Sequence, residues 1–229
     1  KEGYQKHEQW IDLLDNLTKE VVLMKTVPPV TEPSGIDPND PTWCPPEGWT
    51  KVWKFLTEDE LEDFADRDYE YAYVVDSLLK FNPPKDTTGY ASRYKGGTYL
   101  KRIAICSKIN VFSCEVTSPI IYVRIYDGSS AYILNIRQVE YDVTKLQLYD
   151  WVYEIYKKFN NPNDWIVFVF NHETRKARVY DRNKNILAEL TVQPAWIQQI
   201  NYEIYLNEDD FSYLRYEHEV DWVAIQEAQ

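Results

Sequence analysis

The sequence has few of the residues that nucleotide and metal sites require. Only 7 of its 229 residues are glycine, which argues against a phosphate-binding loop or a Rossmann-type dinucleotide site. Its 3 histidines lie far apart and no CxxC pair occurs, so no zinc cluster is expected. No apolar run approaches the ~18 residues of a membrane span.

The cysteine count of 3 is odd, so at least one thiol is unpaired within a monomer. We expect reduced, buried cysteines; the alternative is a Cys106–Cys114 disulfide across a hairpin.

Positive charge is also scarce. The formal net charge is −12, which disfavours nucleic acid as a partner because a polyanion would be repelled. The chain begins with Lys1 rather than Met, which fits the removal of an N-terminal segment.

Aromatic residues are abundant, with 19 Tyr and 8 Trp, and they recur in alternating, β-branched runs. This pattern predicts an all-β fold of antiparallel strands. In one such run, Ile121, Val123 and Ile125 are expected to face the core, while Tyr122, Arg124 and Tyr126 face outward. The expected strands include 69–76, 78–81, 98–106, 111–117, 120–126, 131–138, 165–170, 177–180, 186–192, 202–206 and 214–226.

Three segments are expected to be exceptions to this β pattern. Residues 82–97 are predicted to be a polar loop. Thr57 and Glu60 form a capping-box pattern at the start of a short acidic helix. The spacing of Trp151, Ile155 and Phe159 favours a second short helix within 150–159.

The N-terminal part has a different character. Residues 4–24 form an amphipathic helical pattern, which we interpret as an arm (1–26) that binds a partner or other copies of the chain. Prolines crowd residues 27–48, which predicts an extended linker, and residues 49–229 form the main domain. The apolar stripe of the arm consists of Trp10, Leu13, Leu14, Leu17 and Val21.

The main domain resembles the concanavalin A-like lectin/glucanase superfamily, which includes laminin-G-like domains. The resemblance rests on strand order and texture over residues 49–229. It is carried by Leu78–Phe81, Ser107–Glu115, Ser118–Arg137, Trp165–Leu190 and Val220–Ile225. The resemblance implies a jelly-roll β-sandwich, preceded here by the α-helix and the proline-rich linker.

The superfamily contains both lectins and glycoside hydrolases, and its laminarinase-type hydrolases carry an E-x-D-x-x-E pattern on one strand. This chain lacks that pattern. Glu217, Glu219 and Asp221 share one parity on the last strand, but we expect them to face water and assign no catalytic residue. Neither His172 nor His218 has an evident nucleophile partner, so a catalytic triad is not expected either.

Outward-facing aromatic and polar side chains are the best candidates for sugar binding, although packing between the sheets is the alternative for each. They are Tyr122, Arg124, Tyr126, Tyr132, Trp151 and Trp196.

Asp37, Asn39 and Asp40 could bind Ca²⁺, with a polar turn as the alternative; no other cofactor is expected. The acidic run Glu208–Asp210 is expected to be a solvated loop.

These observations favour a non-catalytic, lectin-like sandwich that binds a glycan or protein surface, or assembles, as in a virion structural or attachment protein. The alternative is a glycoside hydrolase or lyase acting on a polysaccharide. We expect a soluble protein at an extracellular or virion surface.

Overall fold

The computed structural model describes residues 34–228 except 65, 68–69, 127–130 and 193–200, and the side chains of 131–132 are also left undescribed. The expected helical arm, with its stripe from Trp10 to Val21, lies outside the described residues.

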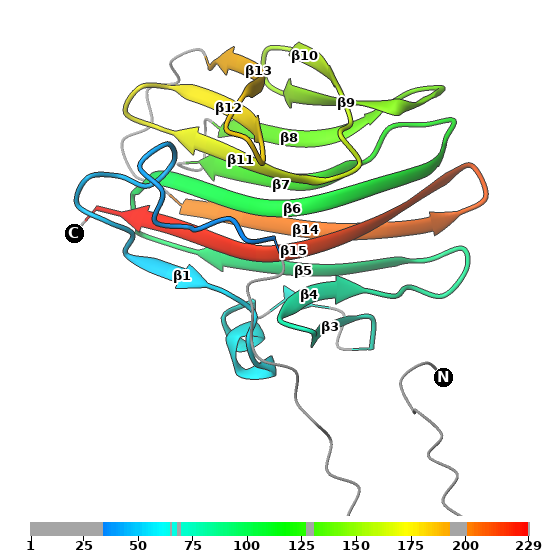
Figure 1. Ribbon diagram of the computed structural model, residues 1–229, viewed down its shortest axis with the longest axis horizontal. Coiled ribbons are helices and arrows are strands. Elements are labelled where there is room, and N and C mark those ends of the chain that lie inside the picture. Colours follow the sequence, from blue (N-terminus) through cyan, green and yellow to red (C-terminus); the bar gives the residue numbers. More distant parts are fainter. Residues whose placement is uncertain (1–33, 65, 68–69, 127–130, 193–200, 229) are drawn as a thin grey trace, which may run out of the picture.

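The chain folds into two antiparallel sheets stacked face to face (Figure 1). Sheet A contains, in spatial order, β13 (Ile186–Thr191), β12 (Lys176–Asp181), β11 (Trp165–Asn171), β6 (Leu100–Cys114), β15 (Leu214–Glu227), β4 (Leu78–Phe81) and β3 (Ala72–Val75); β1 (Lys51–Trp53) also pairs with β15. Sheet B contains β10 (Ile155–Asn160), β9 (Asp142–Asp150), β8 (Ala131–Val139), β7 (Pro119–Tyr126), β14 (Asn201–Phe211), β5 (Thr88–Lys95) and β2 (Asp66–Arg67). The all-β antiparallel sandwich is therefore confirmed.

The main core lies between the sheets and follows the alternation of the sequence. Ile121, Val123 and Ile125 are at most 1% exposed and belong to this core. Their neighbours Tyr122 and Arg124 are only half-buried and lie on the opposite face of β7. The predicted in–out pattern of this strand is confirmed, because strand alternation places successive side chains on opposite faces.

A second apolar cluster covers the outer face of sheet A. It forms where residues 34–49, which we call the N-terminal strap, cross β15 and β6 (Figure 1). Trp43 of the strap is 2% exposed and contacts Trp222, whose indole N–H donates to the Ile36 carbonyl at 3.0 Å. The described part of the predicted linker is thus packed against the sandwich, because its apolar residues find a partner in sheet A.

Several predicted element boundaries are wrong. One continuous strand, β6, replaces the two expected strands at 98–106 and 111–117, and β5 lies inside the expected loop 82–97. The predicted helix at 150–159 is a tight turn followed by β10; Glu154 has φ 54°, which interrupts a right-handed helix.

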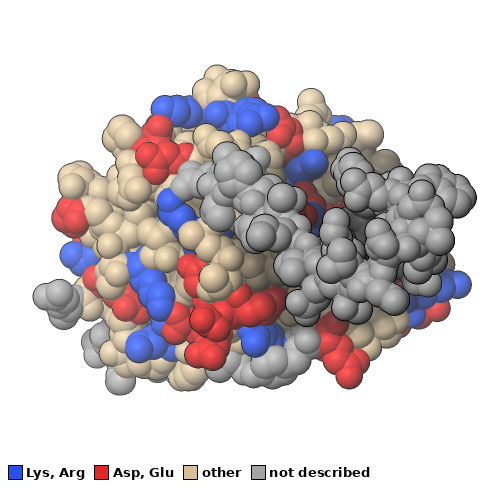
Figure 2. All heavy atoms as spheres, turned by 60° about the horizontal axis from the view of Figure 1, so that its bottom comes forward, with Lys and Arg blue, Asp and Glu red and all other residues tan. Residues whose placement is uncertain are grey.

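The capping-box prediction is also wrong. The segment Glu58–Asp63 is a short 3-10 helix (η1), and the Thr57 side chain makes no capping bond. The Glu60 carboxylate instead accepts the backbone N–H groups of Lys54 and Leu56. The first turn of η1 is acidic, with Glu58, Asp59 and Glu60. Figure 2 turns the lower end of Figure 1 forward and shows acidic side chains gathered on that face.

All three cysteines are free thiols. Cys106 and Cys114 lie on the same strand, β6, and are therefore not opposite each other across a hairpin. No helix within the described residues is long and apolar enough to cross a membrane.

Candidate functional site

A hollow of about 300 Å³ lies at the open edge of the sandwich, between the β14–β15 hairpin and the end of β4. It exists because β14 and β15 pair only at Asp210–Arg215 and Phe211–Leu214 before they enter different sheets. β4 pairs with β15 only at Glu219 and Val220, so the preceding part of β15 borders open space. The hollow is lined by Lys80, Phe81, Asn82, Pro83, Glu208, Asp210, Arg215, Tyr216, Glu217, His218 and Glu219.

Glu208 is the most perturbed carboxyl group of this hollow. Its residue is 8% exposed, and its carboxylate accepts the backbone N–H of His218 at 2.9 Å. Burial raises the pKa of Glu208 to about 8, and the charges of Glu217 and Asp210 add to the rise. Glu208 is therefore mostly protonated at neutral pH.

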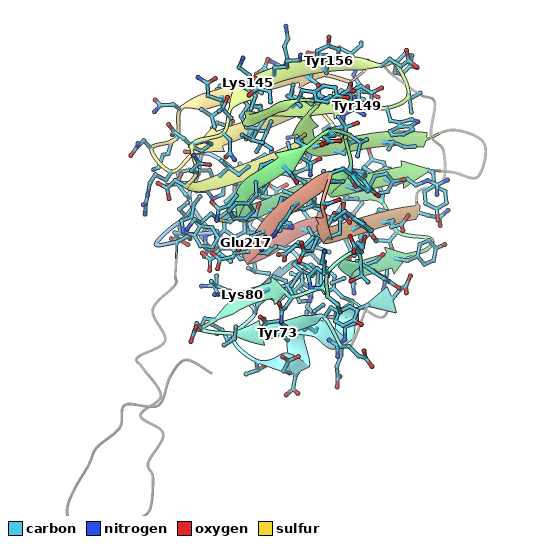
Figure 3. All side chains as sticks on the ribbon, turned by 90° about the vertical axis from the view of Figure 1, so that its right-hand side faces the viewer. Tyr73, Lys80, Lys145, Tyr149, Tyr156 and Glu217 are labelled. Carbon is cyan, nitrogen blue, oxygen red and sulfur yellow. The ribbon has the colours of Figure 1, made fainter. Side chains whose placement is uncertain are left out.

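The other charged groups of the hollow lie at its rim. Glu217 is exposed, Asp210 pairs with Arg215 at 3.3 Å, and Glu219 pairs with Lys80 at 3.0 Å. Figure 3 shows Glu217 and Lys80 on neighbouring parts of the same end of the molecule. A neutral carboxyl group beside a solvated carboxylate can give a proton while its neighbour stabilises positive charge.

His218 forms part of the inner wall. It is 1% exposed, its ring stacks on Phe81 with centroids 5.8 Å apart, and Nδ1 lies 3.1 Å from the Asn207 carbonyl oxygen. Burial lowers the pKa of His218 to about 4, so the ring is neutral. Its Nε2 has no hydrogen-bond partner among the described residues.

The predicted row of solvated carboxylates on the last strand needs correction. Glu217 is exposed and Glu219 is half-buried, but Asp221 is only 2% exposed. A β-bulge lies between Val220 and Trp222, and the strap covers Asp221, which accepts a hydrogen bond from the Ser34 hydroxyl.

A second candidate site is the outer face of sheet B. The strand register places one row of polar and aromatic side chains straight across this face, which we call the aromatic row. It consists of Asp66, Ser92, Tyr205, Tyr122, Asn135, Tyr149 and Tyr156.

Rings and cations pack closely along this face. Tyr205 lies 5.5 Å from Tyr90 and 6.5 Å from Tyr122, measured between ring centroids. The Arg137 guanidinium lies 3.5 Å from the Tyr149 ring centroid, a cation–π geometry. Figure 3 shows Tyr149 and Tyr156 side by side near one end of the row.

The predicted ligand residues occupy different positions on this face. Tyr122, Arg124 and Tyr126 lie on it, and the Arg124 guanidinium is 4.3 Å from the Tyr126 ring centroid. Trp151 is 54% exposed in the turn after β9, with its ring 6.1 Å from Tyr149.

The other two predicted ligand residues, Tyr132 and Trp196, are not placed on the outer face of sheet B by the described residues. Tyr132 is paired with the buried Ile125 in the strand register, and its side chain is not described. Trp196 lies outside the described residues.

The expected calcium ligands serve the turns of the strap. Asp37 accepts the backbone N–H of Asn39 at 2.9 Å, and Asp40 pairs with Lys184 at 2.5 Å. Although burial alone would raise the pKa of Asp40, its hydrogen bonds to Lys184 and Thr42 lower it to about 2. Among the described residues no group of three or more His, Cys, Asp or Glu side chains could hold a metal ion.

Sequence reasoning missed Glu208, which was expected in a solvated loop. The strand expected at 202–206 continues to Phe211, and the alternation of Tyr202, Ile204 and Leu206 extends to Glu208 on the inner side. The alternation that continues to position 208 is the sequence signal for a buried Glu208. The neighbouring Asp209 and Asp210 conceal it, because three acidic residues in a row look like a solvated loop.

The E-x-D-x-x-E pattern of laminarinase-type hydrolases is absent from the sequence, so no strand of sheet B carries it. The outward register of β8 holds Ile133, Asn135 and Arg137, and none of these is acidic. Asn135 is fully buried between Tyr122 and Tyr149, with both amide atoms unpartnered among the described residues. Any catalysis by this chain therefore needs a different carboxylate arrangement.

Comparison with known proteins finds similar folds among solved structures. No protein-family model and no curated protein matches the chain. A structure described in work on endo-acting O-glycanases of the human gut microbiota is similar with a TM-score of 0.56 and 13% identity, covering 78% of this chain and 99% of that one. A Crh5 transglycosylase is similar with a TM-score of 0.53 and 12% identity, covering 82% and 89%.

The fold is therefore that of the concanavalin A-like lectin/glucanase superfamily, as the sequence resemblance predicted. The prediction of a non-catalytic surface or assembly module, and the leaning against an enzyme, are contradicted, because these structural neighbours are glycan-acting enzymes.

Proposed function

We propose that the protein acts on a polysaccharide, as an enzyme that cleaves or transfers a glycosidic bond. The observation that carries the proposal is the hollow beside β15, where Glu208 is held neutral next to the solvated carboxylate of Glu217. Carboxyl groups whose environments differ in this way are the usual acid and base of glycoside chemistry.

In this mechanism Glu208 gives its proton to the glycosidic oxygen as the bond from that oxygen to the anomeric carbon breaks. Glu217 faces the positive charge that develops on the sugar ring. Water, or a sugar hydroxyl in transfer, then adds to the anomeric carbon and returns a proton to Glu208. Arg215 and Lys80, at the rim, are placed to bind hydroxyl groups of the substrate.

The outer face of sheet B is the proposed surface for the rest of the glycan chain. Tyr122, Arg124, Tyr126 and Trp151 belong to this surface, together with the aromatic row. Flat rings offer apolar faces to sugar rings, and the neighbouring polar groups offer partners to hydroxyls. Trp196 remains a predicted member of this surface, and an extracellular location remains a prediction.

Catalysis is tested by assaying new reducing ends on a panel of soluble and insoluble polysaccharides. We expect Glu208→Gln to lower the rate by about 100-fold or more, because the amide cannot give a proton. Glu140→Gln, an exposed carboxylate in the β8–β9 turn, is the matched control and should retain activity. Unchanged activity in a folded Glu208→Gln variant would overturn the assignment of the acid.

Binding is tested separately with the Glu208→Gln variant, which should hold a substrate polysaccharide without cleaving it. We expect Tyr122→Ala in this background to weaken the affinity roughly tenfold, which corresponds to about 1.4 kcal/mol. Tyr141→Ala, at a tyrosine that is 78% exposed in the β8–β9 turn, should leave the affinity unchanged. Equal affinity in both variants would remove sheet B from the proposal but not the hollow.

A further inference from the structure

A second cavity, of about 370 Å³, lies on the outer face of sheet A, on the far side of that sheet from the main core. Its volume falls in the range of small-ligand pockets, about 300–1,000 Å³. One wall comes from the strap and the others from sheet A. It is lined by Thr42, Trp43, Arg102, Val169, Asn171, Thr174, Lys176, Arg178 and Tyr180.

The strand register explains how these side chains converge. Lys176, Asn171 and Arg102 are direct neighbours across β12, β11 and β6 and form one row. The next row places Arg178 beside Val169, which is 7% exposed and forms an apolar floor. Three cations therefore meet around one apolar patch.

The charge of this cavity is opposite to that of the molecule. Its lining holds Arg102, Lys176 and Arg178, and the carboxylate that faces them is Glu189, which pairs with Arg178 at 2.5 Å and Lys176 at 3.1 Å. Three positive charges and Glu189 leave +2, and Glu47 of the strap, which lies within electrostatic reach of Arg102, lowers this to +1. The local charge is still opposite to the formal net charge of the chain, −12.

Arg102 has unused hydrogen-bonding capacity. One terminal nitrogen donates to the Trp43 carbonyl at 3.3 Å, but its buried Nε has no partner among the described residues. A guanidinium presents its N–H groups in a planar fork that matches a carboxylate. The Arg102 side chain lines the cavity, so an anionic ligand there would accept charge-assisted hydrogen bonds from its terminal N–H groups.

The remaining lining suits a sugar ring. The rings of Trp43 and Tyr180 lie 6.2 Å apart at an angle of 62° and, at 2% and 4% exposed, close the inner end of the cavity. Thr42 and Thr174 offer hydroxyl groups, and Asn171 offers an amide. Aromatic rings with a few placed polar groups are typical of sites for small polar ligands.

We propose that this cavity binds an acidic sugar unit, a hexuronate, with its carboxylate on Arg102 and Lys176 and its hydroxyl groups on Thr42, Asn171 and Thr174. The proposal goes beyond the function proposed above, because the cavity lies on the sheet opposite the aromatic row and does not include the hollow beside β15. The cavity is proposed to bind its ligand through charge, without cleaving it.

The test is calorimetric titration of the full chain with glucuronate, with glucose as the neutral probe and sodium sulfate as the simple anion. We expect saturable binding of glucuronate that weakens as salt is added, and at least tenfold weaker binding of glucose and of sulfate. The same comparison in the Glu208→Gln variant should be unchanged, which separates this site from the catalytic proposal.

Lys176→Gln should weaken glucuronate binding about tenfold, since it removes one of the two cations assigned to the carboxylate. Lys157→Gln, an exposed lysine on β10, is the matched control and should bind as the parent does. Equal binding of glucose and glucuronate, sulfate binding as tight as that of glucuronate, or an unaltered Lys176→Gln variant would each overturn the proposal.

Discussion

Two buried groups with opposite pKa shifts, Glu208 and His218, lie on the neighbouring strands β14 and β15. Burial raises the pKa of Glu208 from 4.5 to about 8, and burial lowers that of His218 from 6.5 to about 4. Between about pH 4.5 and 8 the native state holds a Glu208 proton that the unfolded chain releases, so stability falls as pH rises. For His218 the unfolded chain binds the extra proton, so stability rises between about pH 4 and 6.5.

Glu208→Gln should therefore change the pH profile of stability. The amide can still accept the His218 N–H but cannot ionise, so the variant should gain stability relative to the parent as the pH rises. We expect a gain of a few kcal/mol near the upper end of this range and little near its lower end. Urea denaturation at both pH values measures it; a parallel profile would contradict the raised pKa.

The β3–β4 turn carries local strain at two residues. Asp76 and Ser77 have φ of 54° and 59°, and Val75 pairs directly with Leu78, so both central residues of a two-residue turn are left-handed. Glycine adopts this conformation freely. Ser77→Gly should stabilise the protein by about 1 kcal/mol, measured by thermal denaturation, whereas Ser77→Val should destabilise it.

At the scale of elements, Trp43 is the largest buried side chain that packs the strap onto sheet A. Trp43 fills the outer cluster of sheet A, and its indole N–H donates to the Asp37 carbonyl at 2.9 Å. Trp43→Ala should cost about 3–5 kcal/mol if the strap and sandwich unfold together. Limited proteolysis gives a second readout, because cleavage within 34–49 should become faster than cleavage in the sheets. Unchanged protection of this segment would show that Trp43 does not hold it.

The sequence predicted elements well where alternation was strong. β7, β11 and β15 match their expected ranges within a few residues because one face of each is continuously apolar. β5 was missed because its inner positions include Gly89 and Arg93, which give no apolar alternation. The spacing of Trp151, Ile155 and Phe159 imitates a helical period, so the sequence predicts a helix where the structure has β10.

The candidate sites were less predictable than the strands. Tyr122 and Arg124 follow from alternation alone, but the aromatic row depends on register across β2, β5 and β7–β10 as well as β14, which a single sequence does not encode locally. The hollow depends on where β14 and β15 separate. The register between strands and the point at which two strands separate are set by tertiary packing, which a single sequence does not show.

At the scale of the whole molecule, burial should control thiol reactivity. Cys44 is half-buried, whereas Cys106 and Cys114 are buried. Burial raises the pKa of the Cys44 and Cys114 thiols, which lowers their thiolate fraction. With a thiol reagent under native conditions, we expect slow reaction of Cys44 and protection of the other two. All three should react in denaturant, and fast native labelling of three thiols would contradict the packed sandwich.

The position of β15 has a consequence for how the protein is made. This strand, Leu214–Glu227, lies in the interior of sheet A, between β6 on one side and β1 and β4 on the other. During synthesis it emerges from the ribosome after every other strand of the two sheets. Until then β6 has an open edge, and the apolar cluster beneath the strap lacks its β15 members, Trp222 and Ala224. Folding of the sandwich therefore waits until β15 has been synthesised, and a ribosome stalled before residue 214 would display an unpaired sheet edge open to chaperones.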